Sequence, residues 1–391
     1  MSKPNRTILR SIYVHGRPAA HPNRYRILSA IAPRYLPADF WLPWLEAAHP
    51  SIWRKGLSLL GCAMKFPDLK SWHLLIGDGP QPLLPLLRLL GRLSDEQLIV
   101  PYMAGEYAYF VATGYYGRWR TRFHRRFFRL WHGYLSISPL MTRLLKTILP
   151  PRRHKDIIEI RNFFRIERIG LTKIQPCLES RRIVFIGSGS EEFRVHYKGL
   201  DLLFAAVEKA LKEEPQLECV VIGKWTPAIQ KNLAFRYPLA YERSQWVGWV
   251  EDFTSLLESC GLGVQCGRGD AFPNALLEMG LAGLPVLVSE WTGGAHIIQS
   301  IEPELVASLN PTDIARRILF YFSLPPSRRR EMGSWLRHII LTEYNEVKAR
   351  SILRERLRVF LDQTPLRHLD LPVWEEPSAT LALLRDQGYS L

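Results

Sequence analysis

Two carboxylates that stand eight positions apart, Asp270 and Glu278, occur in residues 268–290, RGDAFPNALLEMGLAGLPVLVSE. Pro273 suits the first position of a helix, because the N–H that proline lacks would have no helical acceptor there. A glycine and a proline further on fit the end of that helix. We therefore predict a helix over roughly residues 273–282, with Asp270 in the loop before it and Glu278 inside it.

The start of this helix is a candidate anion site. Its first-turn amides belong to Asn274, Ala275 and Leu276, and such amides lack helical acceptors and lie at the positive end of the helix dipole. Glu278 shares a face with Ala275 and Ala282, and a carboxylate among small apolar residues needs hydrogen-bond donors. The two hydroxyls of a ribose would be such donors, with an attached diphosphate on the helix start.

Asp270 could then reach hydroxyl groups of a further part of the ligand. A structural reading is also open, in which Asp270 is an ordinary loop residue and Glu278 belongs to a salt bridge.

Four short apolar segments, each followed by glycine, predict the strands that position this helix. They are SIYVHGRP (11–18), HLLIGDGP (73–80), RIVFIGSGS (182–190) and ECVVIGKW (218–225). Helical patterns lie between and after them, such as the one in which Leu200, Leu203, Val207 and Leu211 share a face. Strands that alternate with helices indicate parallel sheets covered on both faces.

We therefore predict an α/β protein with two Rossmann-like domains that face a central cleft. The expected boundaries are residues 1–170, residues 171–345, and a C-terminal helix and tail at 346–391 that could return to the first domain.

Composition indicates a folded cytoplasmic protein with an anionic partner. The 391 residues carry a net charge of +15 and a pI near 9.7. No apolar run is long enough for a membrane-spanning helix, the N-terminus lacks an apolar signal core, and the five cysteines form no CxxC pair. Nucleic acid, an anionic membrane surface and phosphorylated small molecules all fit the charge.

Much of the excess charge lies in residues 115–129, YYGRWRTRFHRRFFR. Aromatic residues alternate there with Arg118, Arg120, Arg122, Arg125, Arg126 and Arg129. Arginine mixed with aromatic residues suits a membrane interface, and it also suits stacking on single-stranded nucleic acid. A solvated helix face with buried rings is the third interpretation.

Residues 182–300 resemble the nucleotide-sugar half of glycosyltransferase family 4 enzymes, which have the two-domain GT-B fold. The resemblance lies in an ordered series of motifs: FIGSGS, HYKGLDLL, VVIGKW, SQWVGWVED, and LLESCGLGVQCGRGDAFPNALLEMGLAGLPVLVSEWTGGAHII. In that family two glutamates eight positions apart mark the donor site. The resemblance implies that Glu278 binds the ribose, and it puts Asp270 where the family has the glutamate that binds the hexose. His296 stands where the family often has another glutamate.

The resemblance also implies the other donor-site residues. Lys198 would neutralise the donor diphosphate, and Gly187 would keep the backbone close to the phosphates. The partner arginine of the family is absent, because Ser188 follows Gly187, and Arg194 is the candidate substitute. Gly223, Phe272, and Gly16 in the first loop complete the donor-binding set, and the catalytic candidates are Lys198, Asp270 and Glu278.

The N-terminal half is expected to bind the acceptor. The histidine that the family often has after a later strand is missing from residues 99–107, so His15, His21 and Glu106 are the acceptor-side candidates. Core or loop roles are the alternative for all three.

The resulting hypothesis is a hexosyltransferase that moves a hexose from a nucleoside-diphosphate sugar to a hydroxyl acceptor with retention of configuration. No cofactor and no metal are expected, since the chain has no Asp-x-Asp and GSGSEE is no dinucleotide fingerprint. The resemblance favours a lipid-linked acceptor or a cell-surface polysaccharide precursor, and a cytoplasmic enzyme peripheral to the inner face of an anionic membrane. A nucleic-acid-binding protein and a catalytically inactive GT-B scaffold remain the alternatives.

Overall fold

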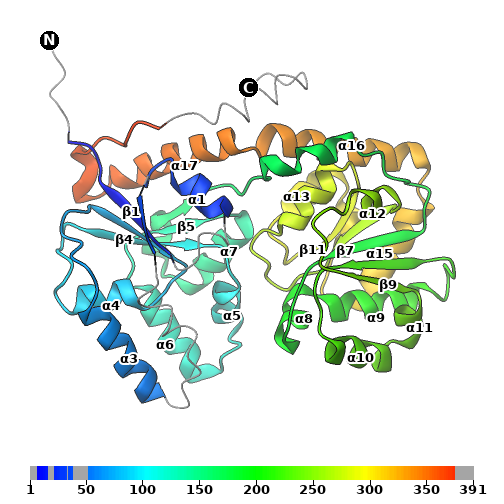
Figure 1. Cartoon of the computed structure of the whole chain (residues 1–391), viewed down its shortest axis with the longest axis horizontal. Coiled ribbons are helices and arrows are strands. Elements are labelled where there is room, and N and C mark those ends of the chain that lie inside the picture. The colour runs from blue at the N-terminus through cyan, green and yellow to red at the C-terminus, as the bar shows by residue number, and fades with distance from the viewer. Residues whose placement is uncertain (1–6, 16–21, 33, 38–51, 375–391) are drawn as a thin grey trace, which may run out of the picture. The chain divides into compact units, whose positions relative to one another are not determined.

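The computed structural model describes residues 7–15, 22–32, 34–37 and 52–374. These residues form two compact units, each with its own parallel sheet (Figure 1). Of the described residues, one unit contains those up to Arg161, without Ser138–Leu140, together with residues 346–374. The other consists of Ser138–Leu140 and Asn162–Asn345. The predicted fold class, two Rossmann-like α/β domains, is confirmed.

The sheet of the N-terminal unit has six parallel strands in the order β2-β1-β3-β4-β5-β6. The strands are β1 (Ser11–His15), β2 (Arg34–Pro37), β3 (Leu74–Asp78), β4 (Leu98–Met103), β5 (Tyr134–Ser136) and β6 (Ile157–Glu159). Every residue of β4, LIVPYM, is buried, as expected for a strand covered on both faces. The order is reversed between β1 and β3, which places a topological switch point there.

Most helices of this unit connect successive strands, and two of them, α17 and η5, come from the residues after the C-terminal unit. They are α1 (Pro22–Leu28), α3 (Ile52–Met64), α4 (Leu83–Leu89), α5 (Tyr107–Thr113), α6 (Arg118–Phe128), α7 (Pro139–Ile148), η2 (Pro151–Asp156), α17 (Glu346–Leu361) and η5 (Pro365–His368). In α17, Leu353, Leu357 and Leu361 are buried at a spacing of four, and the helix packs against α1 and β6.

The sheet of the C-terminal unit has six parallel strands in the order β12-β11-β10-β7-β8-β9. The strands are β7 (Arg182–Ile186), β8 (Glu218–Ile222), β9 (Ser244–Gly248), β10 (Leu262–Gln265), β11 (Val286–Ser289) and β12 (Val306–Ala307). The first strand of the unit, β7, therefore lies beside the fourth, β10. In open parallel sheets, ligands bind beyond the carboxyl ends of the strands at such a switch point.

Helices cover both faces of this second sheet. They are η3 (Ile166–Lys173), α8 (Glu192–Lys198), α9 (Leu200–Ala210), α10 (Pro227–Arg236), α11 (Pro238–Glu242), α12 (Thr254–Glu258), α13 (Asn274–Leu281), α14 (Ala295–Ile301), η4 (Pro303–Leu305), α15 (Pro311–Ser323) and α16 (Pro326–Glu343). The face of α9 that the sequence predicted is buried, with Leu200, Leu203 and Val207 fully inaccessible.

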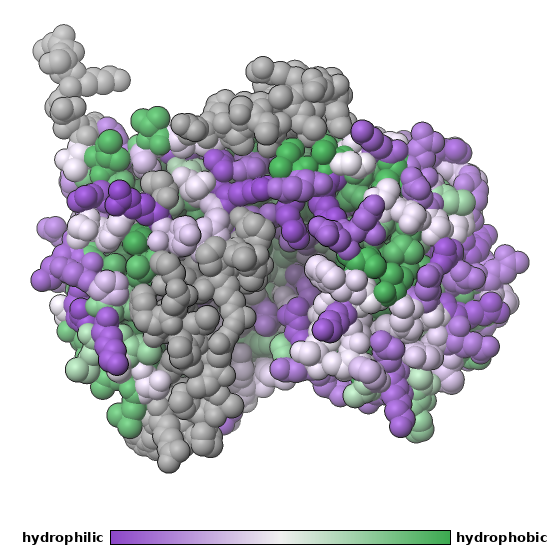
Figure 2. Space-filling model, in the orientation of Figure 1, coloured by the Kyte–Doolittle hydropathy of each residue, from purple (hydrophilic) through white to green (hydrophobic). Residues whose placement is uncertain are grey.

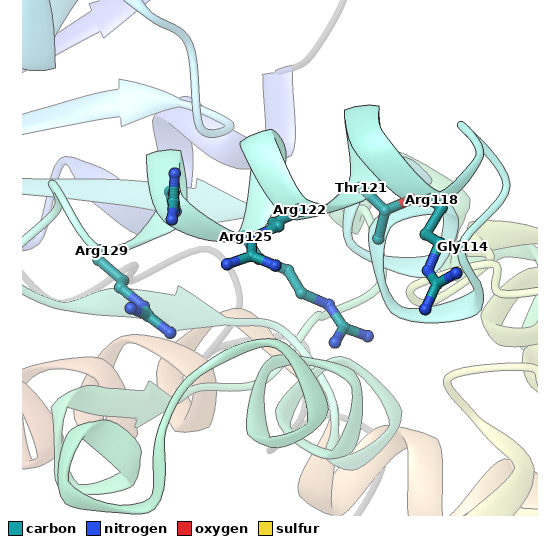
Figure 3. Close-up of a pocket in the computed structure, with 7 residues that line it drawn as sticks. Gly114, Arg118, Thr121, Arg122, Arg125 and Arg129 are labelled. Atoms are coloured by element: carbon teal, nitrogen blue, oxygen red, sulfur yellow. The ribbon is translucent and has the colours of Figure 1, made fainter.

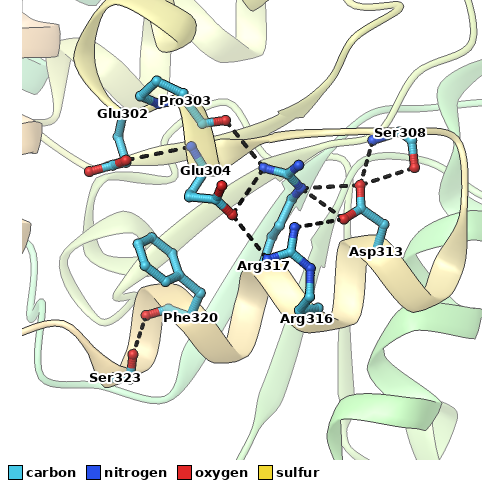
Figure 4. Close-up of polar contacts among 9 residues, drawn as sticks. All are labelled: Glu302, Pro303, Glu304, Ser308, Asp313, Arg316, Arg317, Phe320 and Ser323. Atoms are coloured by element: carbon cyan, nitrogen blue, oxygen red, sulfur yellow. Dashed lines mark hydrogen bonds and ion pairs between the residues drawn. The ribbon is translucent and has the colours of Figure 1, made fainter.

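Helix α15, which packs on α9, is held at its start by a polar network (Figure 4). The side chain of Asn310 accepts a hydrogen bond from the amide of Thr312 and caps the helix. Asp313 accepts hydrogen bonds from Ser308, Arg316 and Arg317. Although partial burial raises the pKa of Asp313, these bonds outweigh it and lower the pKa to about 2. The network therefore stays charged at neutral pH and fixes the loop before α15.

On the face seen in Figure 2, hydrophilic residues cover most of the C-terminal unit, with small apolar areas among them. Among the described residues, no helix combines the length and the apolar character needed to cross a membrane.

Candidate functional site

The residues that the sequence singled out in the C-terminal unit gather at the switch point of its sheet. Gly187 follows β7 directly, and Asp270 lies in the loop after β10. Gln265, the last residue of β10, donates a hydrogen bond from Nε2 to the carbonyl of Ile186 at 3.1 Å, which joins the ends of the two strands. The site is therefore assembled from loops at one edge of the sheet, where this fold class binds its ligands.

Helix α13 begins one residue later than predicted. Pro273 precedes the helix in an extended conformation (φ −68°, ψ 127°) and is its N-cap residue. The amide of Leu276 donates to the carbonyl of Pro273 at 3.2 Å, so it is not free for a ligand as the sequence suggested. The amides of Asn274 and Ala275 still lack helical acceptors, and the anion site is correspondingly smaller.

Glu278 is buried inside α13, with 8% of its surface exposed, and it has a partner that the sequence did not reveal. Arg168 in η3 places Nε 3.3 Å from Oε1 of Glu278. Burial raises the pKa of Glu278, and the charges of Arg168 and Arg165 act in the opposite direction. The salt bridge of the structural reading is thus present. No pattern in the sequence linked Arg168 to residues more than a hundred positions away.

Lys198 and Asp270 form a second, partly buried ion pair. The Nζ of Lys198, at the end of α8, lies 2.6 Å from Oδ2 of Asp270. The next residue, Gly199, has φ +74°, and a Cβ there would lie 1.9 Å from the carbonyl oxygen of Cys266. Only glycine can make this turn so close to the β10 loop, and the turn is what brings Lys198 to Asp270.

The backbones of Gly187 and Gly223 are in close contact at the ends of β7 and β8. Gly223 has φ +127°, and a Cβ there would lie 2.1 Å from the carbonyl oxygen of Gly187. The amide of Gly187 donates to the carbonyl of Ile222 at 2.9 Å. The two strand ends therefore approach each other more closely than residues with a Cβ would allow.

The side chain of Phe272 packs inside the unit instead of lining an open site. Its ring centroid lies 5.4 Å from that of Tyr344, whose hydroxyl is 2.7 Å from Nε2 of His296. The buried Asn162 donates from Nδ2 to the carbonyl of Phe272 at 3.3 Å and to Oδ1 of Asn274 at 3.1 Å. These contacts of Asn162 fix the start of α13, and no pattern in the sequence indicated that it would reach this helix.

Arg194, the candidate substitute for the family's arginine, lies in α8 one turn before Lys198. Its guanidinium is 5.5 Å from the ring centroid of Tyr197. No ion pair to Arg194 occurs within the described part of the chain, so its charge is available to an anion.

The acceptor-side candidates are only partly within the described residues. Gly16 and His21 lie outside them, as does the side chain of His15, the last residue of β1. Glu106 directly precedes α5 and is half-buried, and its side chain does not cap that helix.

A polar cluster that the sequence analysis did not identify occupies the switch point of the N-terminal sheet. Tyr13 in β1 donates to Oδ1 of Asp78, the last residue of β3, at 3.0 Å, and Arg24 in α1 forms an ion pair with the same oxygen. Burial raises the pKa of Tyr13 well above its usual value and that of Tyr102 in β4 to about 12. The signal for this cluster was the aspartate at the end of a strand, in HLLIGDGP.

The basic segment 115–129 contains helix α6, and five of its arginines line a pocket of about 510 Å³ (Figure 3). Besides Gly114 and Thr121, the lining residues are Arg118, Arg122, Arg125, Arg126 and Arg129. Their spacing of three and four residues places them on one stripe of the helix. Arg120 does not line the pocket, so the patch predicted from the sequence is divided between two sides of the helix.

None of these six arginines has an ion pair with an acidic side chain in the part of the chain that the structure describes. Next to the stripe, Trp119 is 82% exposed and Phe123 is 67% exposed. The rings of this segment are therefore divided: Phe128 is buried, whereas Trp119 and Phe123 are exposed beside the arginines.

In the same described ranges, no three His, Cys, Asp or Glu side chains gather as metal ligands would.

Comparison with known proteins agrees with this geometry. Residues 180–323 match the model of the family described as glycosyl transferases group 1, whereas no curated protein matches the sequence. Among solved structures, Anabaena Alr3699/HepE in complex with UDP and glucose is 13% identical, with a TM-score of 0.65 over 89% of this chain and 99% of that one. WaaG, a glycosyltransferase involved in lipopolysaccharide biosynthesis, is 15% identical, with a TM-score of 0.59 over 88% of this chain and 99% of that one.

A glycosyltransferase from Rickettsia africae is 13% identical, with a TM-score of 0.61 over 91% of this chain and 98% of that one. These likenesses extend over both domains, so the chain has the two-domain Rossmann-like fold of the GT-B glycosyltransferases.

Proposed function

We propose that this protein is a glycosyltransferase that takes its sugar from a nucleoside-diphosphate donor bound by the C-terminal unit. The observation that carries the proposal is the buried carboxylate of Glu278, one turn inside a helix that begins at the switch point of a Rossmann-like sheet. The family match at residues 180–323 covers this site, and HepE, which shares the fold, was solved with UDP and with UDP-glucose.

In this proposal the site has three parts. Glu278 accepts hydrogen bonds from the ribose hydroxyls, and the free amides at the start of α13 bind the diphosphate. Lys198 leaves Asp270 to neutralise the departing diphosphate, and Arg194 adds a second charge. Such preorganised charges stabilise the leaving group in the transition state. Asp270, released from Lys198, becomes free to accept hydrogen bonds from the sugar.

The finer features follow the resemblance to family 4. We infer that the transferred group is a hexose, that its anomeric configuration is retained, and that a hydroxyl group of a lipid-linked acceptor or a polysaccharide precursor receives it. We also infer that no metal is needed, because Lys198 and the helix start already supply positive charge for the diphosphate.

A thermal-shift screen tests the central claim. We expect one of UDP-, GDP-, ADP- or TDP-sugars to raise the melting temperature of the protein, because a ligand that binds only the folded state stabilises it by mass action. Hydrolysis or transfer of the same donor would distinguish an enzyme from an inactive scaffold. If none of the four nucleotides shifted the melting temperature at millimolar concentration, the proposal would fail.

We further infer that the enzyme works at the inner face of an anionic membrane and docks there through α6. The supporting observation is the combination of an arginine stripe without acidic partners and the exposed rings of Trp119 and Phe123. Arginines pair with lipid phosphates, each contributing on the order of 1 kcal/mol, while aromatic rings insert among the headgroups. A lipid-linked acceptor would be reached from this position.

Liposome flotation tests the docking surface. Replacing Arg118, Arg122, Arg125 and Arg129 with glutamine should release most of the protein from anionic vesicles. A control that replaces four exposed arginines outside the pocket, Arg120, Arg236, Arg330 and Arg356, removes the same charge and should still float. Equal loss in both variants would mean that only net charge matters, and wild-type binding to neutral vesicles or preferential binding to single-stranded RNA would contradict the membrane assignment.

A further inference from the structure

Arg168 connects the buried Glu278 with a second loop at the edge of the sheet. Its Nε faces the Glu278 carboxylate at 3.3 Å, and its Nη1 donates to the carbonyl of Glu251 at 2.8 Å. The guanidinium also lies over the ring of Phe253, 4.8 Å from its centroid. Residues 249–253 form the loop between β9 and α12, so one guanidinium fixes α13 and this loop together.

We infer that Arg168 is a positioning residue of the nucleoside site, which holds the Glu278 carboxylate in the orientation that receives the ribose and fixes the loop after β9 beside it. The inference rests on the proposed function, and it extends the site to the segment before β7. The planar guanidinium suits this task because its donors point in fixed directions, so contacts on two sides determine its orientation.

The geometry explains why a lone carboxylate would not serve at this position. Glu278 is almost completely buried, and burial favours its neutral form. A neutral carboxyl group accepts the two ribose hydroxyls less well than a carboxylate does. Arg168 supplies the opposite charge, and 24% of its side chain remains exposed.

The charges that act on Glu278 come from Arg168 in η3 and from Arg165 just before it. Arg165 acts on Glu278 through its charge, without a hydrogen bond to it. From α16, which packs along α13, Arg337 donates to the carbonyl of Leu281 at the opposite end of the helix. The nearby side chains of β10 and β11, Gln265 and Ser289, are neutral.

UDP affinity measured by calorimetry from about pH 5.5 to about pH 8.5 tests the inference. We expect R168Q to weaken UDP binding about tenfold at pH 7.5, the effect of one lost charge-assisted contact. The loss should grow as the pH falls, because without Arg168 the pKa of Glu278 rises further and the carboxylate is protonated at a higher pH. R168K should restore the pH profile, since it keeps the charge, but only part of the affinity, since it lacks the planar fork.

Two further variants separate position from charge. R165Q removes a neighbouring charge and should change the pH profile only slightly, whereas K173Q removes an exposed charge from the same 3-10 helix and should change nothing. Wild-type affinity and pH profile in R168Q would overturn the inference and leave the proposed function intact. If R168Q did not fold, R168K with a wild-type profile and wild-type affinity would overturn it equally. A wild type that bound none of UDP, GDP, ADP or TDP would refute the proposed function and this inference with it.

Discussion

Replacing Glu278 with alanine is expected to abolish nucleotide binding while the protein stays folded. Two ribose hydroxyls that donate to a carboxylate contribute about 1.5 to 3 kcal/mol each, so affinity should fall about 100-fold or more. The fold should survive, because the Arg168 side chain that loses its partner is 24% exposed and keeps its hydrogen bond to Glu251. Calorimetry with the nucleotide selected by the thermal-shift screen measures the first effect, and thermal unfolding measures the second.

Two controls make this result specific. E278Q keeps the shape and loses the charge, and it should bind nucleotide more weakly than wild type and more strongly than E278A. E242A removes an exposed carboxylate at the end of α11 and should bind normally. Donor affinity within twofold of wild type in E278A would show that Glu278 is only a structural ion-pair partner.

Replacing Lys198 with alanine is expected to lower turnover much more than it weakens nucleoside binding. The charge of Lys198 is needed most when the diphosphate leaves, and loss of one such group typically costs on the order of 100- to 1,000-fold in kcat. KM for the donor should change by only a few fold. Steady-state kinetics at saturating donor separates the two quantities.

Two further variants test whether the charge of Lys198 is what matters. K198R keeps the charge and should recover part of the turnover, whereas K209A removes an exposed lysine from α9 and should have no effect. An unchanged rate constant in K198A would assign Lys198 a structural role, which is to hold Asp270 and the β10 loop in place.

The fold was predictable because its signals are local and repeated. Apolar runs ending in glycine predicted β1, β3, β7 and β8, and the α9 face followed from its spacing. The start of α13 was off by one residue because proline is equally compatible with the N-cap and the first helical position. The division between the units, at Arg161, lies nine residues before the predicted one, since residues 162–170 contain no strand or amphipathic pattern to mark which core they join.

The site was predictable only as far as its motifs lie in one stretch of chain. Asp270, Asn274 and Glu278 are close in sequence, so their proximity in space followed from one loop and one helix. Arg168 and Asn162 reach the same site from more than a hundred residues away, and that contact depends on tertiary packing alone. The cluster of Tyr13, Arg24 and Asp78 was missed for the same reason.

The segment before β7 has a consequence for how this protein can be divided. The family match begins at residue 180, and a fragment cut there would contain the whole parallel sheet of the C-terminal unit together with Lys198, Asp270 and Glu278. It would nevertheless leave Glu278 without its counter-ion and Phe272 and Asn274 without the amide of Asn162. The smallest fragment that keeps these contacts must therefore start at or before Asn162. The residue at which the family match begins is thus not the residue at which a fragment with an intact site can begin.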